Sequence, residues 1–195
     1  LRITESGSLV VAASSRIAGL TLDRPGGGNS LLSNESGGNR FVIDGDFNWS
    51  EGAIYNLSLD VLGDFNIMED RRHSMLYSRI DVFGDSLWSA GDLHAGGAIY
   101  NHGTFTTASN SDSTASGVSL GHTAGATWIH DAPLVDGDPK KLLGAFYNSG
   151  TFEVRQGSIE LGNCCTPTTH HGSFDVAANA ELNFQGRVDF SDRSA

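Results

Sequence analysis

The amino-acid sequence predicts an all-β fold, a parallel β-helix of about nine coils of about 21 residues each. The first observation behind this is the motif Gly-x-apolar-x-apolar, which returns about once every twenty residues. The second is that its apolar residues stand two apart, the spacing that places side chains on one face of a strand. The third is that so short a unit cannot hold a propeller blade, which needs roughly 40 residues.

The copies of this motif define the coils. They are Gly45–Trp49, Gly63–Ile67, Gly84–Trp88, Gly103–Thr107, Gly125–Ile129, Gly150–Val154 and Gly172–Val176. Alternation along the strands points Trp49 and Trp88 into the core, whereas the fifth copy places Trp128 at an outward position.

Residues 1–195 are interpreted as a single β-helix domain. Strand-like segments near both termini suggest a piece of a longer solenoid, because solenoids normally carry polar caps. Residues 1–44 fit the period poorly and are expected to form irregular early coils, while residues 45–195 form regular coils with loop insertions. The predicted insertions are residues 68–79, 108–119, 130–141 and 163–171.

Composition narrows the classes of partner. The chain has 12 basic against 23 acidic residues and a formal charge of −11. Such a charge repels nucleic acid and anionic membranes, so neither is an expected partner. No stretch approaches the ~18 apolar residues that span a bilayer, so no membrane insertion of this segment is expected.

A second motif, Gly-Ala-Ile/Phe-Tyr-Asn, ends at Asn56, Asn101 and Asn148. Asparagine tolerates left-handed backbone, and its amide can bond to the backbone or to the same residue of a neighbouring coil. The repeat therefore predicts a structural asparagine ladder at a corner of the helix. The preceding tyrosines, Tyr55, Tyr100 and Tyr147, are expected to form a column that faces either inward or outward.

Three acidic residues, Asp46, Asp64 and Asp85, share one motif position in successive coils. If the register holds, they form an outward column of carboxylates about 5 Å apart. The column is a candidate Ca²⁺ site, or an acid/base array facing a polysaccharide. The alternatives are a solvated acidic face and aspartates that cap the glycine corners.

A basic cluster offers a second candidate chemistry. Polysaccharide lyases need a base beside a neutralising group. Residues able to supply both in one stretch are Arg71, Arg72, His73 and Arg79, with Asp81 and Asp85. The alternative is an ordinary solvated loop, and the cluster does not single out a reaction.

The two cysteines, Cys164 and Cys165, are adjacent. They suit a disulfide to another segment or a strained vicinal disulfide. With His170 and His171 they could instead offer four metal ligands, although adjacent pairs do not match the usual zinc spacing.

Three Asn-x-Ser sequons mark candidate N-glycosylation sites at Asn34, Asn48 and Asn56. Glycosylation of this kind belongs to secreted proteins. Asn48 lies at a motif position that strand alternation points outward, so it can carry a glycan.

The segment Ala95-Gly-Gly-Ala-Ile-Tyr-Asn-His-Gly-Thr-Phe105 resembles the Gly-Gly-Ala-Ile repeat of polymorphic outer-membrane proteins and related adhesin-like surface proteins. Gly144–Phe152 is a second copy. The resemblance implies a right-handed helix, extracellular exposure and an adhesive role.

These observations predict a non-catalytic structural or adhesive segment of a cell-surface or appendage protein. Its expected partners are neighbouring copies or other chains of a surface assembly, and its only candidate cofactor is Ca²⁺. The alternative is a polysaccharide-acting enzyme of the lyase or epimerase type, or a carbohydrate-binding β-helix.

Overall fold

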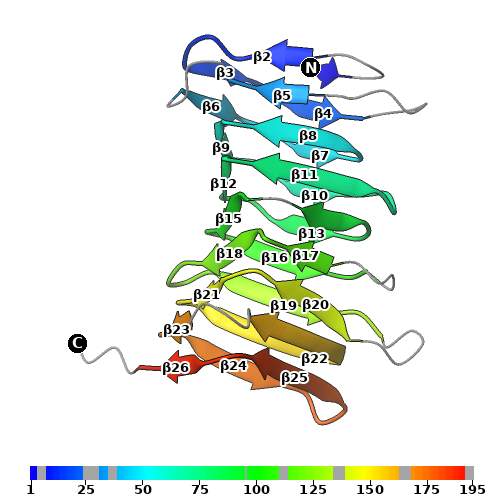
Figure 1. The fold of residues 1–195 in the computed structure, drawn as a ribbon, viewed down its shortest axis with the longest axis vertical. Coiled ribbons are helices and arrows are strands. Elements are labelled where there is room, and N and C mark those ends of the chain that lie inside the picture. The colour runs from blue at the N-terminus through cyan, green and yellow to red at the C-terminus, as the bar shows by residue number, and fades with distance from the viewer. Residues whose placement is uncertain are drawn as a thin grey trace.

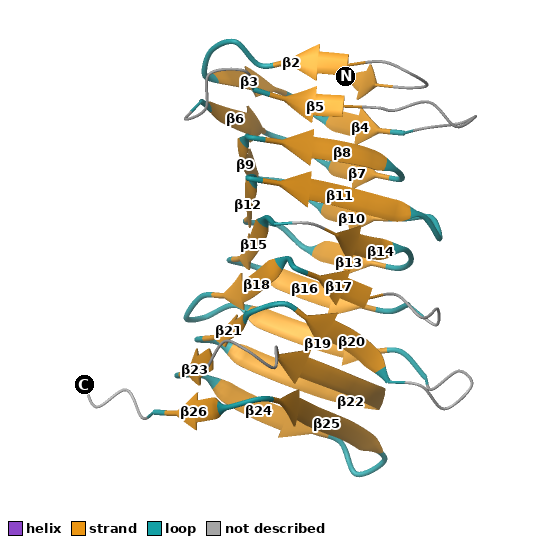
Figure 2. Cartoon of the chain, viewed as in Figure 1, coloured by secondary structure: helices purple, strands orange, loops and turns teal. Residues whose placement is uncertain are grey.

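The chain forms a rod of stacked parallel strands (Figure 1). This computed structural model describes residues 1–3, 8–23, 31–34, 39–94, 96–109, 114–133, 139–162 and 168–191. They contain strands and turns but no helix (Figure 2), and hence no helix long and apolar enough to cross a membrane. The strands wind right-handedly through about eight turns, about 21 residues apart, which confirms the predicted β-helix.

Each of the first seven coils gives one strand to sheet A, one to sheet B and one to sheet C, and every pairing between coils of the described chain is parallel. Sheet A consists of β1 (Arg2–Ile3), β4 (Leu20–Leu22), β7 (Phe47–Trp49), β10 (Phe65–Ile67), β13 (Ser86–Trp88), β16 (Thr104–Thr107), β19 (Thr127–Asp131), the first part of β22 (Thr151–Gly162) and β24 (Ser173–Val176). Sheet B consists of β2 (Ser8–Val10), β5 (Leu31–Ser33), β8 (Gly52–Tyr55), β11 (Arg72–Leu76), β14 (Asp92–His94), β17 (Thr114–Ser116), β20 (Lys140–Leu143), the second part of β22 and β25 (Ala180–Gln185).

Sheet C consists of β3 (Ser15–Ile17), β6 (Arg40–Ile43), β9 (Ser58–Val61), β12 (Arg79–Val82), β15 (Ala98–Asn101), β18 (Ser119–His122) and β21 (Phe146–Asn148). The last two strands, β23 (Thr168–His170) and β26 (Val188–Phe190), pair with each other.

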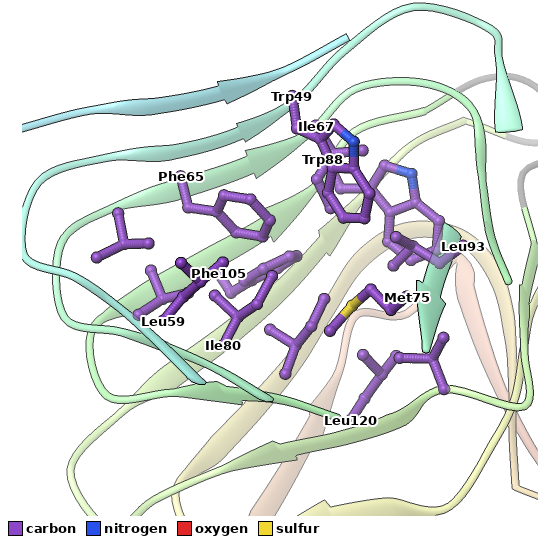
Figure 3. Close-up of a cluster of buried hydrophobic side chains, with 14 of the residues drawn as sticks. Trp49, Leu59, Phe65, Ile67, Met75, Ile80, Trp88, Leu93, Phe105 and Leu120 are labelled. Carbon is purple, nitrogen blue, oxygen red and sulfur yellow. The ribbon is translucent and has the colours of Figure 1, made fainter. Parts of the chain in front are cut away.

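Side chains from the three sheets fill the rod (Figure 3). On sheet A, one inward column is aromatic in most coils. Phe47 stacks on Phe65 with ring centres 5.3 Å apart, and Phe105 stacks on Trp128 at 4.3 Å. Ser86 interrupts the column, so Phe65 and Phe105 meet across it at 6.5 Å. Trp49 and Trp88 are fully buried, as predicted.

The recurring glycine is explained by the corner between sheets C and A, where successive coils come too close for a side chain. A Cβ on Gly63 would lie 2.5 Å from the carbonyl carbon of Gly45, and one on Gly84 would lie 2.3 Å from the Gly63 oxygen. Real Cβ atoms do not approach backbone this closely. The glycines that stand at this corner are thus required by packing between coils.

Trp128 corrects an expectation, because it is fully buried and not outward. Its register partners are Phe105 and Phe152, so Ala126, and not Gly125, holds the glycine position of this coil. Gly125 stands one residue too early and adopts a φ of +86°. The motif of this coil therefore begins at Ala126, one residue later than the sequence predicts.

The predicted irregular segments also need correction. Residues 1–44 contain β1 to β6, which stack in register on the following coils. Residues 68–79 contain β11, which buries His73 and Met75 between outward residues. Because His73 is a polar residue at an inward position, β11 does not show the usual alternation of apolar and polar residues in its sequence. Residues 108–119, 130–141 and 163–171 contribute β17, the ends of β19 and β20, and β23, while 110–113, 134–138 and 163–167 lie outside the described residues.

Candidate binding surface

The outer side of sheet C carries a shallow cleft of about 360 Å³. Strand alternation places two outward positions on each of β6, β9 and β12, and the parallel register stacks them into columns. The cleft is lined by Arg40, Ser58, Asp60, Arg79, Asp81, Phe83 and His102.

Arg79 and Asp81 form the centre of this cleft. The Arg79 guanidinium donates from Nε to Asp81 Oδ2 at 2.5 Å and from Nη2 to Oδ1 at 2.7 Å. It also lies over the Tyr100 ring, 4.4 Å from the ring centre. Nε2 of His102, one coil further on, lies 2.8 Å from Asp81 Oδ1. Arg40 of β6 donates from Nε to Oδ2 of Asp60, which lies on β9 in the neighbouring coil.

The electrostatics keep Asp81 ionised. Burial would raise the pKa of this carboxyl, but the hydrogen bonds from Arg79 and His102 lower it by more, and the net pKa is below its usual value. The same pairing raises the pKa of Arg79. Both groups therefore stay charged across the physiological range.

In this cleft the hydrogen-bond donors of the two arginines are exposed, whereas the carboxylates that accept from them are largely buried. The Asp60 and Asp81 side chains are 8% and 13% exposed, whereas those of Arg40 and Arg79 are 63% and 54% exposed. Both oxygens of Asp81 are engaged by its neighbours. The cleft can therefore hold a ligand that accepts hydrogen bonds, but its carboxylates are not free to abstract a proton.

His102 is held on two sides. Its ring stacks on Phe83 with the centres 4.5 Å apart and the planes 9° apart, and its Nδ1 lies 3.4 Å from Thr123 Oγ1. Sequence reasoning missed this histidine. The signal was available, because His102 stands 21 residues after Asp81, which is one coil.

The basic cluster predicted from the sequence does not assemble as a unit. Arg79 and Asp81 meet, but His73 is fully buried and its Nε2 lies 3.0 Å from the Trp49 carbonyl oxygen. Nη1 of Arg71 lies 3.6 Å from Oε2 of Glu51. Asp85 is exposed at the corner between sheets C and A. Arg72 is exposed at the start of β11, on sheet B. Of the predicted cluster, the Arg79–Asp81 pair remains a candidate for function.

The acidic column exists as an arrangement. Asp46, Asp64 and Asp85 are exposed and precede register-paired strands of sheet A. The side chain of Asp46 accepts a hydrogen bond from the Asp64 backbone nitrogen at 3.1 Å, as a corner cap does. Across the described part of the chain, no three His, Cys, Asp or Glu side chains gather to hold a metal ion. Calcium binding by Asp46, Asp64 and Asp85 therefore stays a prediction, and their side chains do not form a cluster of metal ligands.

The asparagine ladder is only partly as predicted. Asn101 and Asn148 lie in one inward column of sheet C, with His122 between them. Asn56 does not join, because its copy of the motif forms β8 on sheet B. The identical copies at residues 52–56 and 97–101 therefore occupy two different sheets, and spacing alone could not distinguish them. Tyr55 is separated from Tyr100 and Tyr147 for the same reason.

The side chains of Asn101 and Asn148 form hydrogen bonds with the backbone, which is one of the two arrangements that the sequence predicts. Each side chain accepts from the backbone nitrogen two residues later, at 3.0 Å in both cases. Each amide also reaches the next coil, where Asn148 donates to the Ser173 oxygen at 2.8 Å. These fully buried side chains thus fasten the corner between sheets C and A.

The three sequons differ in accessibility. Asn34 is only 1% exposed, which corrects its assignment as a glycosylation site, because a glycan needs an accessible amide. Asn48 is half-buried and accepts a hydrogen bond from Asn66 at 3.0 Å. Asn56 is half-buried with a φ of 53°. The last two stay candidate sites.

The proposed cysteine and histidine ligands cannot all be placed, since Cys164 and Cys165 lie outside the described residues. The two histidines point opposite ways. His170 is 2% exposed and packs edge-on against Phe174 at 5.3 Å, whereas His171 is exposed beside Ser191 Oγ at 2.7 Å. One ion between these two rings is therefore disfavoured.

A further polar group lies inside the rod, between sheets A and B. Lys140 is 5% exposed, and its Nζ lies 3.8 Å from the centre of the Trp88 ring with no hydrogen-bond partner among the described residues. Burial lowers its pKa to about 7. Burial and the charge of Lys140 together lower the pKa of His130 to about 4.

Comparison of the chain with protein-family models, curated proteins and solved structures finds no significant match.

Proposed function

We propose that this chain is a non-catalytic structural or adhesive segment of an extracellular surface protein. The observation that carries the proposal is that the polar side chains best suited to catalysis are engaged with one another. Asp81 is held by Arg79 and His102, Asp60 by Arg40, and His73 is buried against backbone carbonyls. A catalyst needs an acid or base free to exchange a proton with substrate.

The recurring motifs support the same proposal. Their glycines allow coils to approach, and Asn101 and Asn148 fasten a corner. Repetition here builds the rod, and the rod leaves long outer faces available to partners. Neighbouring copies or other chains of a surface assembly are the proposed partners.

Localisation tests this proposal directly. An antibody raised against the chain should label intact, unpermeabilised cells of the source organism in electron microscopy. Labelling that requires permeabilised cells would contradict the surface assignment. Long fibres or stalks with a regular axial repeat would favour the structural role.

A second candidate is an enzyme that acts on acidic polysaccharides, and the Arg79–Asp81–His102 cluster in a cleft favours it. Unsaturated products absorb in the ultraviolet, so turnover of polygalacturonate and alginate can be followed directly. The proposed non-catalytic role predicts flat traces for both. Turnover that is lost in His102→Gln but kept in His171→Gln would establish the enzyme and overturn the proposal.

A further inference from the structure

An exposed aromatic patch lies at the corner between sheets B and C. It consists of Tyr55, Leu76 and Tyr77, which are 41%, 36% and 70% exposed. Leu76 is the register partner of Tyr55 in the neighbouring coil, and Tyr77 follows it in the chain. The Tyr55 and Tyr77 rings meet edge to face, with centres 6.0 Å apart and planes at 75°. We name these three residues the tyrosine patch.

Tyr77 holds a backbone conformation that does not suit it. Its φ is +53°, in the left-handed region that disfavours bulky side chains. Other coils place residues that tolerate this region at the equivalent corner, namely Asn56 with a φ of +53° and Gly117 with a φ of +72°. Asparagine or glycine would therefore carry less backbone strain than tyrosine at this corner.

Core packing does not explain Tyr77 either, because 70% of the residue is exposed. A strained residue that the fold does not need is a reason to look for function at that place. What Tyr77 adds to the surface is a second aromatic ring beside Tyr55.

The size of the tyrosine patch limits its partner. A buried aromatic side chain covers 150–250 Å², so the exposed parts of these three residues amount to about 300 Å². A stable protein interface needs about 800 Å² from each partner. One or two sugar rings fit the smaller area, with their C–H faces against the aromatic rings.

Among the described residues, those that adjoin the patch in register and sequence are uncharged. Its neighbours in register and sequence are Ser33, Asn56 and Ser78, and Tyr77 donates its backbone N–H to the Gly96 oxygen at 2.9 Å. The chain as a whole carries a formal charge of −11, which repels anionic ligands. Ser33 and Ser78 are only 7% and 5% exposed, so the polar groups that a sugar can reach here are the tyrosine hydroxyls and the half-buried Asn56. Such uncharged groups beside aromatic rings suit a neutral saccharide.

We propose that the tyrosine patch binds a neutral saccharide. This proposal rests on the adhesive role given above and names the chemical class of its partner. Sugar rings stack on Tyr77 and Tyr55, and their hydroxyl groups exchange hydrogen bonds with the tyrosine hydroxyls and with Asn56. No bond is made or broken.

The test uses the 195-residue chain and the Tyr77→Asn variant. Titrations with cellohexaose, xylohexaose, mannohexaose and chitohexaose, followed by NMR shifts and calorimetry, should show at least one ligand for the wild type. Loss of an aromatic contact weakens binding by about tenfold. Tyr77→Asn should therefore bind that sugar at least about tenfold more weakly and yet melt at a higher temperature, because the strain is relieved.

This paired outcome excludes misfolding as the cause of lost binding. Tyr147→Asn is the matched control, since Tyr147 is 39% exposed on sheet C and lies outside the patch. It should bind the sugar as the wild type does.

Three results would overturn the proposal: no binding by the wild type to any of the four sugars, unchanged binding by Tyr77→Asn, or equal loss in Tyr147→Asn. Dimers of the wild type that Tyr77→Asn abolishes would assign the patch to self-association instead. Each of these outcomes leaves the surface location of the protein to its own test by electron microscopy.

Discussion

The ammonium group of Lys140 lies 3.8 Å from the centre of the Trp88 ring, inside the rod and out of contact with any carboxylate oxygen among the described residues. The indole face offers the cation some attraction. That attraction does not replace the water that burial removes, so the pKa of Lys140 falls from 10.5 to about 7.

The first prediction follows from this pair. Between pH 7 and pH 10.5 the unfolded chain binds a proton at Lys140 that the folded chain releases, so stability rises with pH across this window. Lys140→Met removes the cost and should raise the unfolding free energy at pH 7 and below by about 1–3 kcal/mol. Urea unfolding at several pH values measures this. Lys141→Met, at the half-exposed neighbour, leaves Lys140 in place and should keep both the stability of the wild type and its dependence on pH.

A second prediction concerns acid. His122 is 3% exposed and packs against Phe146, Trp128 and Phe152, and burial lowers its pKa to about 4. Between pH 6.5 and pH 4 only the unfolded chain takes up this proton, so stability falls as the pH falls. His122→Phe keeps the ring shape and should retain up to about 2 kcal/mol more stability at pH 4.5 than the wild type. An acid-unfolding curve identical to that of the wild type would refute this.

The glycine corner gives a third prediction. Gly63→Ala places a Cβ 2.5 Å from the Gly45 carbonyl carbon, so the backbone must move, at a cost of about 1–3 kcal/mol. Gly96→Ala meets no atom within 4 Å and should be neutral or slightly stabilising. Thermal unfolding of the two variants makes the comparison, and equal melting temperatures would count against the packing explanation.

A fourth prediction concerns the inward asparagines. Asn148→Ala leaves the Gly150 nitrogen and the Ser173 oxygen without their bonds to this buried amide, which costs about 2–3 kcal/mol. Asn66→Ala removes only a half-buried bond to Asn48 and should cost less than about 1 kcal/mol. Denaturant titration of both variants decides whether inward and outward amides differ as described.

Much of the fold was predictable because glycine spacing and alternation of apolar residues are local patterns. They identified the β-helix and the buried Trp49 and Trp88. The register failed at Trp128, where Ala126 replaces a glycine, and in β11, where buried His73 reads as a polar residue. The register of a coil depends on which of its residues pair with the neighbouring coils. The types of residue within one coil do not determine that pairing.

The candidate site was less predictable. Arg79 and Asp81 were found because they are close in sequence, whereas His102 joins them only through the stacking of coils. The strain at Tyr77 is a backbone property with no signature in residue type. The Gly-Ala-Ile/Phe-Tyr-Asn repeat was misleading, since its identical copies at residues 52–56 and 97–101 occupy sheets B and C.

The interruption of the aromatic column at Ser86 has a mechanical consequence. Parallel strands stacked along the rod direct their hydrogen bonds along its length (Figure 1), so a force that separates its two ends loads every bond of one coil interface together. Elsewhere, stacked rings such as Phe105 and Trp128 resist that separation as well. Around Ser86 the rings of Phe65 and Phe105 meet only across the gap, so under tension the rod should part first at this level.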